Sequence, residues 1–364
     1  MLPAWVAEMD YPLAEPIRKA LRHALDEHDT GYAFPAQIGE AFARWAARRW
    51  GWELFPEDVH VVADVVIGIG EVLRVSTSPG DRVLIEPPVY PPFAETIRET
   101  GRAISVAPLA FRGDRWEPDL DAIARAYAAG VRAHLLCSPQ NPTGMAYSKE
   151  ALSVIAQLAS RYGVLVISDE IHAPLTLPGA DHHPYPTVSE EARRTSVVLT
   201  SASKAWNIAG LKAALIIASS DEGRAILART PPAAPYHAGH FGVLAARAAF
   251  EHGDAWLAST REILDRNRAL LADLLAARLP GVRYVPPRAG YLAWLDCRAL
   301  GLGDDPADVF LARGRVALSP GPSFGQEGEG FARLNIGTTR TLLEEAVRRM
   351  ALAVQEERPR SRPA

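Results

Sequence analysis

Short apolar runs alternate with amphipathic segments through the middle of the chain, from residue 59 to residue 217. The runs have the length of buried strands, and the segments between them carry apolar residues at helical spacing. This alternation predicts an α/β fold with a mostly parallel, seven-stranded sheet covered by helices on both faces. In such a sheet, ligands bind beyond the carboxyl ends of the strands. The expected strands are residues 59–62, 82–85, 103–106, 133–137, 164–168, 196–199 and 213–217, with helices at 67–77, 91–100, 120–129 and 149–162.

The pattern changes after residue 221, where long helical stretches lead to shorter strand candidates. Together with the N-terminal segment, this part predicts a smaller α+β domain, and 364 residues are enough for two domains. We therefore expect a large domain over residues 31–264 and a small domain made of residues 1–30 and 265–364. The further elements expected are helices at 13–28, 38–50, 237–251, 255–279 and 341–354, and strands at 282–285, 291–295 and 331–336.

The balance of charge disfavours several classes of protein. The 39 basic and 43 acidic residues are spread without long like-charge blocks, so neither a nucleic-acid groove nor a basic membrane-binding face is expected. No apolar run is long enough to cross a bilayer, and the first residues have no signal-peptide pattern. The two cysteines lie in apolar, strand-like runs, so we expect buried free thiols and a reducing, cytoplasmic location.

A single lysine, Lys204, closely follows an apolar run and lies among small hydroxyl residues. Partial burial at such a strand end lowers the pKa of a lysine and makes its amine nucleophilic. The amine can then hold an aldehyde cofactor as a Schiff base, while Ser201 and Ser203 can donate to a phosphate group. A surface lysine in a polar loop is the alternative. It is disfavoured because partners for pyridoxal 5'-phosphate (PLP) follow several other strands.

Two turns after expected strands provide weaker signals. Gly68 lies where a strand passes into a helix, and glycine there lets backbone amides approach a phosphate, although packing explains it equally well. A dinucleotide site is disfavoured, because Leu73 stands where a third motif glycine belongs. Tyr90 lies between prolines that restrict its backbone, so its ring can either stack on a cofactor or pack within the loop.

Polar residues follow two further apolar strands. Asn141 lies in an Asn-Pro-Thr-Gly turn; its amide can hydrogen-bond a phenolic oxygen, or the turn can be structural alone. Asp169 ends the most apolar strand, where a carboxylate is costly unless it is paired, for example with a protonated pyridine nitrogen. His172 can face the ring oxygen or the substrate. A metal site at Asp169, His172 and the 181–183 cluster is disfavoured, because no further ligand has a dependable spacing.

Arg333 lies between apolar neighbours in a strand-like segment near the C-terminus. A buried guanidinium needs a carboxylate, and the α-carboxylate of an amino-acid substrate would accept hydrogen bonds from both arms of its fork. A structural ion pair explains the residue equally well, so the sequence pattern leaves both explanations open.

With these residues, the chain resembles the fold type I PLP-dependent enzymes, the aspartate-aminotransferase-like superfamily of class I/II aminotransferases. It is most similar to their cystathionine β-lyase (C–S lyase) branch of the MalY/PatB type, and the resemblance runs nearly from end to end. The motifs that carry it are Trp5-Val6-Ala7-Glu8-Met9-Asp10-Tyr11-Pro12, Gly31-Tyr32, Pro87-Pro88-Val89-Tyr90, Asn141-Pro142-Thr143-Gly144, Asp169-Glu170-Ile171-His172, Ser203-Lys204-Ala205-Trp206-Asn207-Ile208-Ala209-Gly210-Leu211 and Arg333-Leu334-Asn335.

Taken residue by residue, the resemblance implies a PLP site built from several strand ends. Lys204 would bind the cofactor and later move the α-proton, and Asp169 would pair with the pyridine nitrogen. Arg333 would bind the substrate carboxylate, and Tyr32 would reach the cofactor of a second subunit in a homodimer with shared sites. The other implied contacts are Tyr90, Asn141 and His172 at the ring, and Ile67, Gly68, Ser201, Ser203 and Lys212 at the phosphate.

Three positions depart from the pattern of the family. Glu8 stands where aspartate is usual, Ile67 where proline is frequent, and Lys212 where many relatives have arginine. The last two lie among the implied phosphate contacts.

The activity that the resemblance implies is a PLP-dependent β-elimination. It would release a thiol, pyruvate and ammonia from cystathionine or from a related S-substituted cysteine. An aminotransferase shares every cofactor residue and is the nearest alternative, because a fold does not determine a reaction. A PLP-binding regulatory protein without turnover is the more distant alternative.

Overall fold

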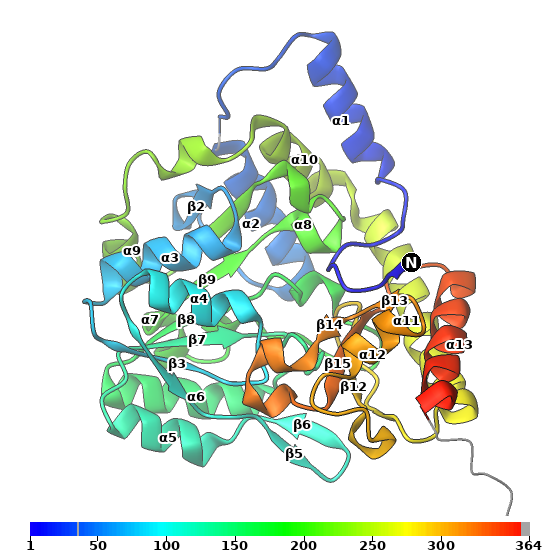
Figure 1. The fold of residues 1–364 in the computed structure, drawn as a ribbon. Helices are drawn as coiled ribbons and strands as arrows, with labels where there is room; N and C mark the ends of the chain where they lie inside the picture. The colour runs from blue at the N-terminus through cyan, green and yellow to red at the C-terminus, as the bar shows by residue number, and fades with distance from the viewer. Residues whose placement is uncertain (35, 358–364) are drawn as a thin grey trace, which may run out of the picture.

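A seven-stranded sheet forms the centre of the computed structural model, which describes residues 1–34 and 36–357 (Figure 1). Its strands follow the order β2-β10-β9-β8-β7-β3-β4, and all run parallel except β10, which is antiparallel to both neighbours. The predicted sheet is therefore confirmed, and every strand ends within one residue of its expected position. The strands are β2 (Val59–Val62), β3 (Arg82–Ile85), β4 (Ala103–Val106), β7 (Ala133–Cys137), β8 (Leu165–Asp169), β9 (Ser196–Thr200) and β10 (Ala214–Ile217).

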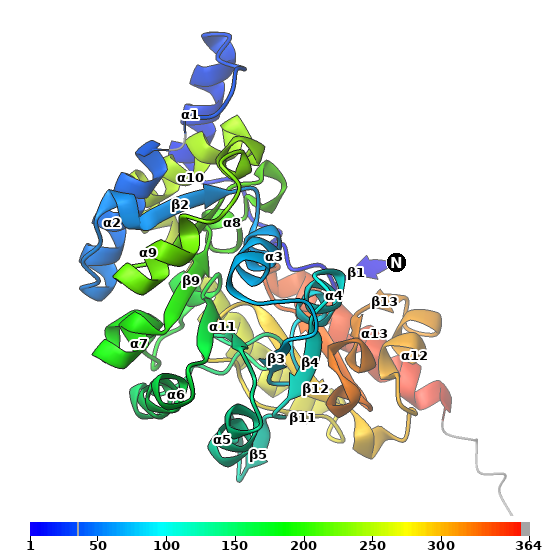
Figure 2. The same cartoon turned by 90° about the vertical axis from the view of Figure 1, so that its left-hand side faces the viewer.

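Helices cover both faces of the sheet (Figure 2), and alternate residues of the central strands pack against opposite layers. In β3, Val83 and Ile85 pack in one hydrophobic cluster, and Leu84 packs in another on the opposite face. Because both faces are buried, these strands are mostly apolar on both sides, which is the pattern of a parallel sheet. One layer contains α3 (Val65–Ser76), α4 (Pro91–Glu99) and α9 (Asp221–Leu227); the other contains α5 (Leu120–Ala128), α6 (Lys149–Tyr162), α7 (Glu190–Arg194), α2 (Ala36–Trp50) and α10 (His240–His252).

A smaller sheet of four strands, in the order β11-β12-β15-β14, follows in the C-terminal part. Its apolar residues share a core with α11 and α13, as expected for a small α+β unit. The division of the chain at residues 30 and 264 remains a prediction, and residues 358–364 lie outside the described residues. The elements are α11 (Asp254–Arg278), β11 (Arg283–Tyr284), β12 (Leu292–Asp296), α12 (Pro306–Ala312), β13 (Val316–Ala317), β14 (Ser319–Pro320), β15 (Phe331–Asn335) and α13 (Arg340–Glu357).

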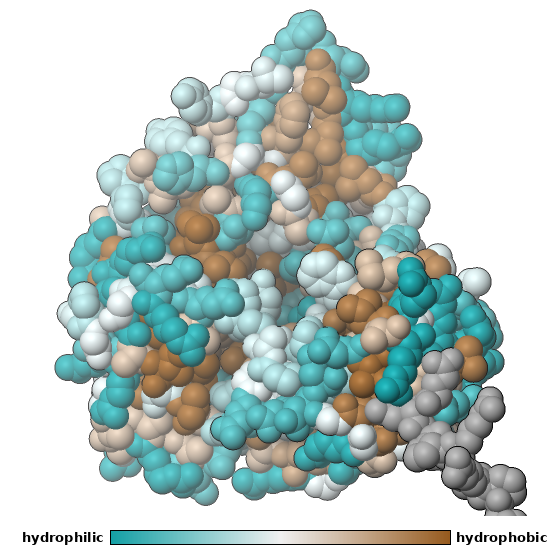
Figure 3. Space-filling view, viewed as in Figure 1, coloured by the Kyte–Doolittle hydropathy of each residue, from teal (hydrophilic) through white to brown (hydrophobic). Residues whose placement is uncertain are grey.

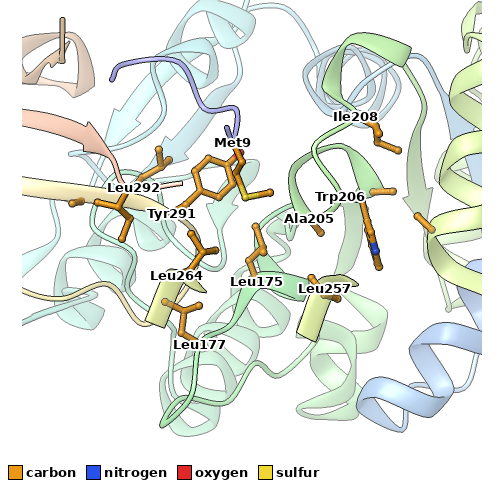
Figure 4. Packing of buried hydrophobic residues seen from close by; sticks show 14 of the residues in the cluster. Met9, Leu175, Leu177, Ala205, Trp206, Ile208, Leu257, Leu264, Tyr291 and Leu292 are labelled. Carbon is orange, nitrogen blue, oxygen red and sulfur yellow. The ribbon is translucent and has the colours of Figure 1, made fainter. Parts of the chain in front are cut away.

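The N-terminal segment is part of the hydrophobic core. Its strand β1 (Leu2–Pro3) pairs in parallel with β13, and Met9 is buried in the largest apolar cluster. Figure 4 shows Met9 beside the ring of Tyr291, with Leu264 close by. The side chain of Asn207 holds the backbone of Met9 on both sides, accepting from its amide at 2.9 Å and donating to its carbonyl at 2.7 Å. Packing and hydrogen bonds therefore fix this segment across the interior of the molecule.

The helix α1 (Glu15–Asp26) rises away from the rest of the fold and packs against α10 (Figures 1 and 2). The hairpin of β5 (Ala110–Arg112) and β6 (Arg115–Glu117), which the sequence pattern did not predict, projects at the opposite end. Among the helices of residues 1–34 and 36–357, none is long and apolar enough to cross a membrane.

Candidate active site

A cavity of about 240 Å³ opens at the carboxyl ends of the parallel strands. The last residues of β7 and β8, Cys137 and Asp169, line it, and so do the loops that follow β3 and β9. The fold thus brings together residues that are far apart in the sequence, as expected for a parallel sheet. The predicted site residues on its wall are Tyr90, Asn141, Asp169, His172, Ser203, Lys204 and Lys212, and the further lining residues are Ala7, Asp64, Val65, Val66, Cys137, Ile171 and Ala209.

Lys204 reaches this cavity from α8 (Ala202–Ala205), which begins directly after β9. The Ser201 hydroxyl caps this short helix by accepting a hydrogen bond from the Ser203 amide. The Nζ atom of Lys204 donates to the carbonyl oxygen of Ala7 at 2.9 Å. Burial, reinforced by the positive charge of Arg333, lowers the pKa of Lys204 from its usual value. A larger fraction of the amine is therefore neutral and nucleophilic than in a solvated lysine.

Asp169 is buried at the end of β8, and its Oδ1 atom accepts a hydrogen bond from the Ile171 amide at 3.0 Å. Burial raises the pKa of Asp169 to about 7, although the Ile171 amide acts in the opposite direction. None of the described residues forms a salt bridge with this carboxylate. Its position therefore fits a cationic group inside the cavity, such as the protonated pyridine nitrogen of PLP.

Two aromatic groups form part of the cavity wall. Tyr90 directly precedes α4, whose first residue is Pro91, and its ring contacts Phe93 edge-on at 6.0 Å. His172 is buried, contacts the ring of Tyr291 edge-on, and has no hydrogen-bond partner at Nδ1 within the described structure. Burial lowers the pKa of His172 to about 3, so the imidazole is neutral at physiological pH.

Arg333 lies on β15, opposite Trp294 of β12 and Ser319 of β14, and is buried at the edge of the site. Its Nη1 atom donates to Asn141 Oδ1 at 3.0 Å, and its Nη2 atom donates to the Trp5 carbonyl and the Ser319 hydroxyl. Burial lowers the pKa of the guanidinium to about 10, which still leaves it charged at neutral pH. No salt bridge to Arg333 is present in the described part of the chain, so a buried cation remains available for a carboxylate ligand.

The backbone of the N-terminal segment lies across this cluster, which the sequence patterns did not reveal. The Ala7 carbonyl accepts from Lys204 and also from the Tyr291 hydroxyl at 2.8 Å. The Asn335 side chain donates to the carbonyl of Val6 at 2.7 Å. A main-chain carbonyl has no signature in a sequence, so only the folded chain identifies these contacts.

The start of α3 differs from the expectation. The helix begins at Val65, because the Asp64 side chain caps it by accepting from the Ile67 amide at 2.8 Å. The Gly68 amide donates to the Asp64 carbonyl, so the expected amides of Ile67 and Gly68 are already engaged. The amides of Val65 and Val66 have no acceptor within the helix, as is usual in a first turn, and both residues line the cavity. The aspartate that precedes this helix was the available sequence signal.

Gly68 instead allows α3 to approach the sheet closely. A Cβ atom at this position would lie 2.6 Å from Leu199 Cδ2, which is closer than van der Waals contact permits. The packing explanation therefore accounts for this glycine.

Three other expected site residues, Arg333, Ser201 and Tyr32, lie outside the cavity wall. The Ser201 hydroxyl is buried and donates to the Ala213 carbonyl at 2.6 Å. Tyr32, in the loop after α1, is 89% exposed to solvent.

His182, one of the residues considered for a metal site, has a structural role in the fold. Within the described ranges, no group of three or more His, Cys, Asp or Glu side chains is arranged to hold a metal ion. His182, which belongs to the 181–183 cluster, contacts the buried carboxylate of Glu170 at 2.9 Å instead. That carboxylate also accepts from the Ser168 hydroxyl and the Tyr185 amide, so these residues form a structural network beneath the site.

Comparison with known proteins identifies the family of the chain. The model of the family "Aminotransferase class I and II" matches residues 6–350, and the chain belongs to this family. A Mycobacterium tuberculosis protein, provisionally named cystathionine beta-lyase, is 44% identical over 98% of this chain and 93% of its own length. Cystathionine beta-lyase PatB of Bacillus subtilis is 35% identical over 97% of this chain and 92% of its own.

Solved structures agree as well. The PLP-bound C–S lyase of Staphylococcus hominis superposes with a TM-score of 0.91 at 28% identity, over 97% of this chain and 93% of that one. The expected aspartate-aminotransferase-like fold is thus confirmed.

Proposed function

We propose that this chain is a PLP-dependent C–S β-lyase that acts on cystathionine or on related S-substituted cysteines. The observation that carries the proposal is one cavity lined by both Lys204, an amine of lowered pKa, and Asp169, a buried carboxylate that forms no salt bridge with any described residue. These are the two groups that an aldehyde cofactor with a pyridine nitrogen requires. The lyase reaction is supported by the names of relatives that are 34–44% identical over nearly the whole chain.

The residues of the cavity divide the work of an elimination. When bound, PLP supplies an electron sink for the electron pair that remains at Cα after proton loss. Asp169 keeps the proton on the pyridine nitrogen, and Lys204 Nζ removes the α-proton as a general base. Arg333 holds the substrate carboxylate, so that Cα faces Lys204, and Asn141, which accepts a hydrogen bond from Arg333, would contact the ring oxygen. The Cβ–S bond then breaks, and reaction with water yields the thiol, pyruvate and ammonia.

The phosphate would be held where α3 begins. The amides of Val65 and Val66 lie on the cavity wall with Ser203 and Lys212, and a helix N-terminus attracts anions. The ring would lie between Tyr90 and the opposite wall, near His172.

Replacement of Arg333 by lysine is expected to raise the KM for amino-acid substrates by about 10–100-fold, with a smaller change in kcat. Lysine keeps the charge but loses the planar fork that binds a carboxylate at two points. Steady-state kinetics with an S-substituted cysteine and its methyl ester provides the test. The ester is the control, since its KM should change little. An unchanged KM for the free acid would remove Arg333 from the carboxylate site.

Incubation of the PLP-loaded protein with L-cystathionine tests the reaction itself. Free thiol and pyruvate should appear in equal amounts over many turnovers. If a keto acid forms only when an amino-group acceptor is present, and no thiol is released, the chain is an aminotransferase and the lyase proposal fails.

We further propose a homodimer. Tyr32, Phe34 and Tyr236 are large side chains that are more than half exposed, and Figure 3 shows apolar residues along α1, which precedes two of them. A partner subunit would cover this surface, and Tyr32 would then reach the partner's cofactor. Light scattering should give twice the 39.5 kDa of one chain. A monomeric mass at micromolar concentration would contradict the proposal.

Location in the cytoplasm is also proposed. Cys137 and Cys297 are both free and buried, which suits a reducing compartment. Fractionation of the source cells provides the test, and recovery in the extracellular fraction would contradict it.

We keep the two-domain division as part of the proposal, with residues 31–264 as the cofactor domain and residues 1–30 with 265–364 as the small domain. The separate four-stranded sheet supports it. Limited proteolysis provides the test. The absence of a protected fragment that ends near residue 264 would argue against the division.

A further inference from the structure

An acidic side chain stands where the phosphate is expected. Asp64 lines the same cavity as Lys204 and Asp169, at the N-terminus of the 12-residue helix α3. Its Oδ1 atom accepts from the Ile67 amide at 2.8 Å, and its Oδ2 atom lies 3.0 Å from Lys212 Nζ. The Asp64 carboxylate therefore already binds the Ile67 amide and the Lys212 ammonium group, which are two groups at this end of the cavity that favour an anion.

The same partners are those that a phosphate needs. A helix N-terminus and an ammonium group attract any anion, whether it belongs to a side chain or to a ligand. A phosphate that arrives at Val65 and Val66 meets a fixed negative charge, and it competes with that charge for Lys212. Competition for this one ammonium group lowers the affinity for a phosphate by roughly tenfold, which is the scale of a single charge pair a few ångströms apart at an exposed site.

Lys212 is placed to exchange one anion for the other. Its backbone adopts a left-handed conformation with φ of 59°, and its carbonyl accepts from the Gly239 amide at 2.8 Å, so the main chain is held in place. Its side chain is 58% exposed, and the carboxylate of Asp64 is its only salt-bridge partner within the described residues. The ammonium group is therefore held by one exposed ion pair, which is weak.

We propose that Asp64 is an internal competitor for the phosphate subsite, which lowers the affinity of the chain for PLP by occupying Lys212. This inference rests on the proposed cofactor site and extends it. PLP binds only as Lys212 turns from Asp64 to the phosphate, and Asp64 keeps its bond to the Ile67 amide. Because this competition lowers the affinity for PLP, bound PLP exchanges readily with free PLP. Pyridoxal lacks the phosphate, so its affinity does not depend on Asp64.

The test compares cofactor affinity in Asp64→Asn and in the unaltered protein. Asparagine also caps helices well, so the substitution removes the charge and retains the cap. Apo protein is titrated with PLP and, separately, with pyridoxal, and Kd is measured from absorbance and from the quenching of tryptophan fluorescence. Asp119→Asn is the matched control, because Asp119 caps α5 in the same way, through the Ala122 amide, and lies outside the cavity wall.

Asp64→Asn is expected to lower the Kd for PLP by about tenfold and to leave the Kd for pyridoxal unchanged. Asp119→Asn should change neither. In a Lys212→Met background, the gain from Asp64→Asn should shrink, because the two anions no longer compete for an ammonium group. An equal or weaker affinity of Asp64→Asn for PLP, with normal helix content by circular dichroism, would overturn the proposal. So would an equal gain with and without Lys212.

The cofactor site and the competitor role fail in different ways. If the unaltered protein shows no absorbance band that depends on Lys204 when PLP is added, the cofactor site itself is wrong and the inference falls with it. If the band forms and the Kd ratio between Asp64→Asn and the unaltered protein is near one, only the competitor role is wrong.

Discussion

Replacement of Lys204 by alanine is expected to reduce the rate of thiol release by at least about 10⁴-fold. The amine has two roles in the proposed reaction, since it binds the cofactor covalently and moves the α-proton. Loss of a general base alone typically costs ~10²–10⁴-fold, and loss of the covalent link adds to it. The variant should still bind PLP weakly, because Asp169 and the start of α3 remain. Coupled measurement of thiol and pyruvate, together with the absorbance of bound PLP, checks both expectations.

Lys149→Ala is the control for this variant. Lys149 is exposed at the first position of α6, outside the cavity wall, so its removal should change neither rate nor absorbance. Alanine at residue 204 should also preserve the fold, since α8 is capped by Ser201 and not by the lysine. Wild-type turnover in Lys204→Ala would refute the proposed active site.

Asp169→Asn is expected to affect cofactor-loaded and cofactor-free protein in opposite directions. In the loaded enzyme, asparagine cannot keep the pyridine nitrogen protonated, and we expect turnover to fall by ~10²–10³-fold. In the apo protein, the substitution removes a buried carboxylate that forms no salt bridge among the described residues. Apo Asp169→Asn should therefore be more stable than the apo wild-type protein at pH 8, by up to about 4 kcal/mol.

The pH dependence of this stability difference follows from the direction of the pKa shift. The pKa of Asp169 is raised from 3.8 to about 7 in the folded chain, so the folded state holds a proton that the unfolded state releases in this range. Stability of the apo wild-type protein therefore decreases as the pH rises from about 4 to about 7, and Asp169→Asn lacks this decrease. Urea denaturation of both apo proteins at pH 4 and pH 8 measures it. A difference that is the same at both pH values would exclude the shift as its cause.

A control for nonspecific charge effects is Asp114→Asn, in the exposed turn between β5 and β6. This substitution removes the same charge without relieving any burial, so the stability difference between its two pH values should match that of the wild-type protein.

The main sheet could be predicted because its strands are buried on both faces. Burial on both sides makes the strands predominantly apolar runs, such as Ala214–Ile217, and the amphipathic helices between them have a different period. The short elements that the patterns missed include α7, α9, α12 and the β5–β6 hairpin, and none of these helices or strands is longer than seven residues. Their positions depend on contacts with the rest of the fold rather than on their own periodicity.

Helix starts were less predictable, and one of them matters for the site. A helix was expected from residue 67, whereas α3 begins at Val65 because the Asp64 carboxylate caps it. The difference of two residues moves the uncommitted amides from Ile67 and Gly68 to Val65 and Val66. A helix boundary depends on the capping residue as well as on the apolar pattern. The apolar pattern alone therefore does not locate the first residue of the helix.

The motifs in the sequence were enough to identify Lys204, Asp169, Asn141 and Tyr90 as polar residues at or shortly after strand ends. Their motifs are local, and the end of a strand is a local property of the chain. The fold was needed to show that Lys212 contacts Asp64, 148 positions away, and that Lys204 contacts the Ala7 carbonyl, 197 positions away. Such contacts depend on strand order and on the path of an N-terminal segment with no periodic pattern, because distance in space is set by packing and not by spacing along the chain.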